Sequence, residues 1–269
     1  TITNANDVTF VSTVETVGDL VQQDGTGTTA FHGTGVTGIG GQLNITTDNV
    51  TFSTADMVTV GPIIVTADNA ITLNPNAGLN AGASTITLLA NQDVAGTQGF
   101  TQADGTTIQT TNAAADAVTI TVGGTGSAAI ADIQAAGVVT ITALGGAITD
   151  NTAGEGANIT ASGVALTAGT GIGGTGTADI DTAVDNLEAA TATGGIVIEE
   201  ADAVTLGGVN GTLDGVDVLT SGNIAITAHG SITVTEQITG PDDIALTATG
   251  SNSDLTVQVN SGVASTDGN

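Results

Sequence analysis

The sequence contains no lysine and no arginine among its 269 residues, although it has 27 aspartates and glutamates. A soluble domain is usually about a quarter charged, with both signs present. Without basic side chains the protein has no cationic patch that neutralises phosphates, which argues against nucleic-acid binding. Electrostatic docking to an anionic membrane is disfavoured for the same reason. The formal net charge of -27 instead indicates a surface that gathers cations.

Cysteine, tryptophan and tyrosine are also absent, and proline occurs only three times. Without cysteine, neither a disulfide framework nor a thiolate metal site can form. The longest apolar runs are too short to span a bilayer, so we expect no membrane insertion. Hydrophobic residues still make up 40% of the chain, which is enough to build a core. Forty glycines and abundant threonine indicate many short strands and tight turns.

A short unit recurs along the chain, in which an apolar residue, a threonine or alanine and a second apolar residue follow one another. The unit begins at Val8, Val50, Ile71, Val118, Val139, Val164, Val204, Ile224 and Ile244. Most offsets between successive units are close to one or two multiples of about 20 residues, the length of one solenoid turn. A further copy at Ile86 lies off this series and is interpreted as a second strand of a coil.

Apolar and polar residues alternate with a period of two within these units, which is typical of β-strands. The sequence therefore predicts an all-β fold, a right-handed parallel β-helix (β-solenoid) with coils of about 20 residues. We expect one domain over residues 1–269, less regular at 1–48 and 90–112. Thr1 begins no recognisable signal peptide and the tail is polar, so we expect a processed or partial segment of a longer exported protein.

Two alternatives accompany this prediction. An array of antiparallel sandwich modules would also give many short strands, but its period is usually much longer than the one found here. Residues 181–190 form the one stretch with helical spacing, because Ile180, Val184 and Leu187 follow an i, i+4, i+7 pattern. The same residues also fit a bent strand.

The repeats at residues 202–208, 222–228 and 243–248, and the run 170–198, resemble the degenerate repeats of giant bacterial surface proteins. These include filamentous-haemagglutinin-like β-helical adhesins and β-strand-repeat proteins. The resemblance covers most of the chain and is clearer after Ala113. It implies an extracellular β-helix that serves as an adhesin stalk, a fibre or a cell-envelope layer. It implies no catalytic residue.

Acidic residues one to three positions ahead of the repeat units are the candidate metal ligands. They are Asp7, Asp48, Asp68, Asp116, Asp202 and Asp243. In a solenoid these carboxylates could stack at one corner and share Ca²⁺, which prefers oxygen ligands. The alternative is an Asx turn, in which the side chain accepts a hydrogen bond from a nearby backbone amide. No other cofactor is expected.

Three further groups of residues have both a functional and a structural interpretation. Glu199 and Glu200 could form a paired-carboxylate acid–base site, but adjacent strand residues point to opposite faces, so a solvated strand end is expected. His32 and His229 are expected to be exposed corner residues. Outward Thr-x-Thr pairs such as Thr119 and Thr121 suggest an ice-binding face, although alanine interrupts the array in several coils.

These observations predict a non-catalytic extracellular structural protein of a bacterial surface fibre, stalk or envelope layer. Polysaccharide enzymes on β-helices usually need basic or aromatic side chains, which this sequence lacks or nearly lacks. We expect self-association into a fibre or sheet by strand pairing, with cation bridging as a further contribution, since no polar cap is evident at either end. The alternatives are a stalk segment within one long chain and a calcium- or glycan-binding module, with the surface receptor unknown.

Overall fold

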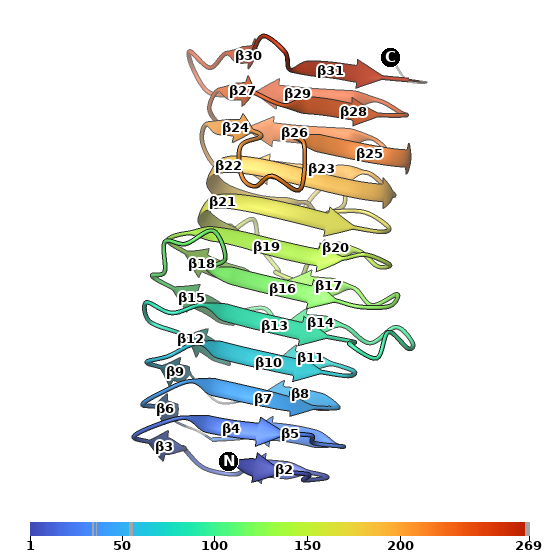
Figure 1. The fold of residues 1–269 in the computed structure, drawn as a ribbon. Helices are drawn as coiled ribbons and strands as arrows, with labels where there is room; N and C mark the ends of the chain where they lie inside the picture. The colour runs from blue at the N-terminus through green and yellow to red at the C-terminus, as the bar shows by residue number, and fades with distance from the viewer. Residues whose placement is uncertain (34, 36, 54–55, 267–269) are drawn as a thin grey trace.

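The computed structural model of the chain describes residues 1–33, 35, 37–53 and 56–266. Within these residues the fold is an all-β parallel solenoid of about 11 turns, each of roughly 23 residues, without helices. Figure 1 shows the turns stacked on one another from the N-terminus at one end to the C-terminus at the other. The predicted parallel β-helix is therefore confirmed. None of the described residues belongs to a helix with the length and apolar character needed to cross a lipid bilayer.

Each lower turn contributes three strands, one to each of three columns of parallel strands, here called A, B and C. Column A contains β1 (Ile2–Thr3), β4 (Leu20–Gln23), β7 (Leu43–Thr47), β10 (Ile63–Ala67), β13 (Ile86–Ala90), β16 (Val118–Val122) and β19 (Val138–Ala143). Column B contains β2 (Val8–Phe10), β5 (Thr28–Phe31), β8 (Asn49–Phe52), β11 (Ile71–Leu73), β14 (Phe100–Gln102), β17 (Ala128–Ile130) and β20 (Ile148–Asp150). Column C contains β3 (Glu15–Thr16), β6 (Thr37–Ile39), β9 (Met57–Thr59), β12 (Gly78–Asn80), β15 (Thr107–Thr110) and β18 (Asp132–Ala135).

Above these turns, two long strands cross corners of the solenoid and link the lower columns to the upper ones. They are β21 (Ile159–Ala168), which pairs with both β18 and β19, and β22 (Ile180–Thr193), which pairs with β23, β24 and β25. The upper columns are β23 (Ile196–Glu200), β26 (Ile224–Ala228) and β29 (Ile244–Ala248); β24 (Val204–Leu206), β27 (Ile232–Val234) and β30 (Leu255–Val257); and β25 (Val216–Ser221), β28 (Gln237–Gly240) and β31 (Gly262–Ser265).

The repeat units found in the sequence lie in more than one column. The units at Val8, Val50 and Ile71 lie in column B, whereas those at Val118 and Val139 lie in column A. The copy at Ile86 belongs to column A, where it pairs with Ile63 and Val118, so it lies in a different column from the unit at Ile71 and in the same column as the unit at Val118. Turn length varies because corner loops differ, and the turn between Ile86 and Val118 includes the loops 91–99 and 111–117.

The stretch 181–190 is strand, so the helical alternative is wrong and the bent-strand alternative is confirmed. Ile180, Val184 and Leu187 all point into the core. The helical spacing arises because the strand turns a corner between Val184 and Leu187. There the exposed Asp185 and half-buried Asn186 shift the alternation by one residue.

Inward-facing valine, isoleucine and leucine side chains form one continuous core along the solenoid. Because the strands pair in register, each inward residue packs on its equivalents in the turns above and below. In column B this register stacks three aromatic rings, with centroids 4.7 Å apart for Phe10 and Phe31 and 5.3 Å apart for Phe31 and Phe52. Phe31 is 1% exposed and lies in the middle of the stack.

Gly194, at the corner between β22 and β23, has a backbone conformation that disfavours other residues. Its φ is +84°, and a Cβ atom there would overlap the carbonyl oxygen of Thr170 in the preceding turn. We expect Gly194→Ala to lower the free energy of unfolding by about 1–3 kcal/mol. Urea unfolding followed by far-UV circular dichroism measures the change.

Gly38→Ala in β6 is the matched control, since Gly38 has ordinary φ and open space around the position of a Cβ atom. It should change stability by no more than about 0.5 kcal/mol. Equal effects of the two substitutions would contradict the assigned corner geometry.

Candidate functional site

The six aspartates predicted as metal ligands are distributed over several corners. Asp48 and Asp68 lie at one corner in consecutive turns, because Ala67 pairs with Thr47 and the Asp68 amide donates to the Thr47 carbonyl. Asp7 precedes β2 and therefore lies ahead of the same column B as Asp48 and Asp68. The other three are elsewhere: Asp116 precedes β16 in column A, Asp202 precedes β24 and Asp243 precedes β29. The structure therefore does not bring the six together in one column.

One member of this set has a defined role in the backbone network. Asp7 Oδ1 accepts a hydrogen bond at 2.8 Å from the backbone amide of Thr28, which lies in the next turn. This bond links two coils rather than closing a local turn. Among the described residues, none of the six belongs to a group of three acidic or histidine side chains with ligand atoms within 4.8 Å of one another. Calcium at these positions stays a prediction.

A different group of carboxylates does converge, and we call Glu155, Asp179 and Asp181 the acidic cluster. One carboxylate oxygen from each residue lies within 4.8 Å of the others. Glu155 is exposed on the loop that joins β20 to β21, whereas Asp179 and Asp181 are each 8% exposed at the start of β22. The cluster therefore connects one turn of the solenoid to the next.

A buried asparagine fixes this part of the backbone. Asn158 is fully buried, and its side-chain oxygen accepts the Asp181 backbone N–H at 2.8 Å. Its amide nitrogen donates to Asp150 Oδ1 at 2.6 Å and to the Ala131 carbonyl at 3.3 Å. Asn158 therefore joins the turn that carries Glu155 to the turn that carries Asp181.

Burial and mutual repulsion make ionisation costly in the acidic cluster. Burial raises the pKa of Asp181 to about 7, and the negative charges of Asp179, Glu155, Glu199 and Asp150 add to this rise. Burial also raises the pKa of Asp179, although its own backbone amide partly opposes the shift. Asp179 Oδ1 is in addition buried without a hydrogen-bond partner. These are the properties of a site that lacks positive charge.

The adjacent pair Glu199 and Glu200 does not form an acid–base site. Glu199 lies on the outer face of β23, where its Oε1 is 2.7 Å from Nε2 of the half-exposed His229. Glu200 points inward and is fully buried, so the expectation of a solvated strand end is wrong for this residue. Its carboxylate accepts hydrogen bonds from the Thr182 hydroxyl at 2.7 Å and from the Val184 amide at 3.2 Å. These donors on the neighbouring β22 make burial possible.

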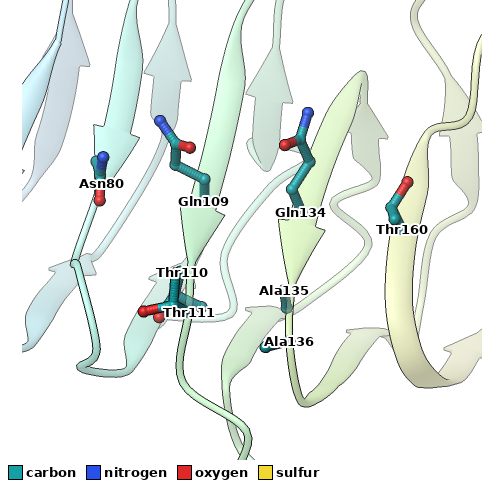
Figure 2. Close-up of a pocket in the computed structure, with 8 residues that line it drawn as sticks. All are labelled: Asn80, Gln109, Thr110, Thr111, Gln134, Ala135, Ala136 and Thr160. Carbon is teal, nitrogen blue, oxygen red and sulfur yellow. The ribbon is translucent and has the colours of Figure 1, made fainter.

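A second surface feature is a groove of about 260 Å³ along column C and the part of β21 that pairs with it. Figure 2 shows Asn80, Gln109, Gln134 and Thr160 following one another across adjacent strands, where they lie in register. Threonine and alanine side chains complete the groove. The lining residues offer amide and hydroxyl hydrogen bonds but no group that titrates near neutral pH. The groove therefore fits polar contacts better than acid–base chemistry.

The acidic cluster was not predicted from the sequence. Glu155 lies between two glycines and far from Asp179 in the chain, so no short motif joins them. A signal was present in the Asp-Ile-Asp pattern at 179–181, directly ahead of an apolar strand. Glu155 meets these aspartates because of the length of the turn between them. No repeat in the sequence reveals that length.

No protein-family model matches this sequence, and comparisons with curated proteins and with solved structures also find no match.

Proposed function

We propose that this chain is a non-catalytic structural protein of a bacterial surface fibre, stalk or envelope layer, located outside the cell. The proposal also holds that copies associate end to end. The observation that carries it is the partly exposed apolar core at the last described turn, which a second copy or a further turn of the same polypeptide can cover. Composition supports the non-catalytic role, because the chain has no arginine, lysine, tryptophan or tyrosine with which to hold a polysaccharide substrate.

Inward-facing residues of the last turn are half exposed although their equivalents one turn below are buried. Leu255, Val257 and Val263 are 49%, 48% and 44% exposed. They pair in register with Ile232, Val234 and Ile238, each of which is 0% exposed. Among the described residues, β29, β30 and β31 each pair with one strand only, so they form an edge of the solenoid. This end is therefore suited to cover by another turn.

The first turn of a second copy matches this edge in direction. Every strand pairing in the described residues is parallel, so β1, β2 and β3 run in the same sense as the strands at the other end. At this first turn Phe10 is half-buried, whereas Phe31, its partner in the next turn, is buried. A head-to-tail contact between two different ends does not close on itself, so it propagates into a fibre.

We expect the chain to associate into filaments as salt concentration rises from about 0.01 M to about 0.5 M, because salt screens the repulsion between acidic copies. Sedimentation velocity and negative-stain electron microscopy measure the association. Val257→Asp should prevent it by placing a charge on the open end.

Leu219→Asp is the matched control, since Leu219 is 73% exposed on the side of the solenoid rather than at its end. It should leave filament formation unchanged. A monodisperse monomer at every salt concentration would refute end-to-end association and favour the alternative, a stalk segment in which a following turn of the same polypeptide covers this edge.

A further inference from the structure

The acidic cluster brings together two nearly buried carboxylates and one exposed carboxylate from adjacent turns. We propose that Glu155, Asp179 and Asp181 bind one calcium ion, which joins the loop 151–158 to the start of β22. This inference does not depend on the function proposed above. It also concerns residues other than the six aspartates singled out in the sequence.

The spacing of the oxygens matches a hard divalent cation. Calcium is coordinated by oxygen at about 2.4 Å, so two ligand oxygens on one ion lie at most about 4.8 Å apart. The carboxylate oxygens of the acidic cluster are within 4.8 Å of one another. Three carboxylates then supply part of the coordination shell, and water or backbone carbonyls complete the six to eight ligands that calcium takes.

The chain itself offers little positive charge to neutralise the acidic cluster. It has no lysine or arginine, and the nearby imidazole of His229 is already paired with Glu199. Asp150 and Glu199 add negative charge around the same position. The charge that balances these groups must therefore be a proton or a cation from solution. A divalent ion neutralises two carboxylates at once and replaces repulsion with attraction.

The unpartnered oxygen of Asp179 points to the same conclusion. Asp179 is 8% exposed, and its Oδ1 accepts no hydrogen bond. A buried polar atom without a hydrogen-bond partner destabilises the fold, so such atoms are rare unless a ligand completes them. The fully buried carboxylate of Glu200, by contrast, accepts hydrogen bonds from Thr182 and Val184.

Loop geometry favours calcium over magnesium. Glu155 lies between Gly154 and Gly156, both of which have open space around them, so its side chain can approach the ion from solvent. Calcium tolerates irregular and variable coordination, whereas magnesium requires near-octahedral geometry at about 2.0–2.1 Å and retains its waters. Asp179 and Asp181 are held in nearly buried positions, whereas the exposed Glu155 can adjust its position. Such an irregular set of ligands fits calcium better than magnesium.

The first experiment is isothermal titration of the chelator-treated full chain with CaCl₂ in about 0.15 M KCl, which screens diffuse attraction. We expect one saturable site per chain. Asp179→Asn should weaken it by at least about tenfold, and magnesium should bind less tightly. Asp24→Asn, which removes one exposed carboxylate in the loop after β4, should retain the site. The absence of saturable binding, or equal binding by Asp179→Asn, would overturn the proposal.

A second measurement, of melting temperature, distinguishes calcium bound at this site from general screening of the negative charge by salt. In metal-free buffer we expect Asp179→Asn to melt at a higher temperature than the natural chain, because it relieves repulsion. Calcium should raise the melting temperature of the natural chain but not that of the variant. Glu155→Gln, on an exposed loop, tests the site without disturbing the core. If NaCl at equal ionic strength produces the same rise, the proposal is wrong.

Discussion

Replacing Phe31 with alanine should lower the free energy of unfolding by about 3–5 kcal/mol. Phe31 is 1% exposed and stacks on Phe10 on one side and on Phe52 on the other. Removal of its ring leaves a cavity in the core and ends both aromatic contacts, which are worth more than their buried area alone. Urea unfolding followed by circular dichroism measures the loss, since the chain has no tryptophan or tyrosine to report by fluorescence.

The position of Phe31 adds a second expectation. Each turn of a solenoid contacts only its neighbours, so the damage should be concentrated in the turns that contain β2, β5 and β8. Hydrogen exchange should become faster in these strands and remain unchanged in β26 to β28. Thr9→Ala, on the exposed face of β2, is the control and should change stability by less than about 0.5 kcal/mol. A comparable loss in both variants would contradict the core assignment.

Glu200 should make the protein less stable as pH rises from about 4.5 to about 7. Burial raises the pKa of this carboxyl from its ordinary 4.5 to about 7, against the opposing hydrogen bonds from Thr182, Asp202 and Val184. The folded state therefore holds the proton more tightly than the unfolded state. The resulting stabilisation is fully present below about pH 4.5 and is lost as pH passes through about 7. The expected loss is about 3 kcal/mol.

Comparison with a variant isolates this contribution from the other acidic groups, whose titration is common to all variants. Glu200→Gln cannot titrate at this position, so its unfolding free energy should fall less over the same range. Glu15→Gln, which removes an exposed carboxyl on β3, should retain the full pH dependence of the natural chain. Urea unfolding at constant ionic strength in metal-free buffers measures all three proteins. Identical pH profiles for the natural chain and Glu200→Gln would show that Glu200 titrates normally.

Local alternation was sufficient to predict the strands and the direction of their side chains. In the run 118–122 the alternation predicts that Val118, Ile120 and Val122 share one face, and all three are at most 1% exposed. The same alternation places the side chains of Glu199 and Glu200 on opposite faces of β23. It does not show that Glu200 is completely buried, because the donors that permit this come from Thr182 and Val184 in the previous turn.

The sequence by itself determined the fold class, because a period of two marks strands and a recurrence near 20 residues marks stacked turns. Its composition also determined that no lysine or arginine can balance a buried carboxylate. Only the tertiary structure decided which turns are adjacent at each corner, because loops of variable length separate the strands. That adjacency places Glu155 beside Asp179 and Asp181, and it does not gather the six predicted aspartates into one group. Short-range patterns specify strands, whereas a site formed between turns depends on distances that no local pattern contains.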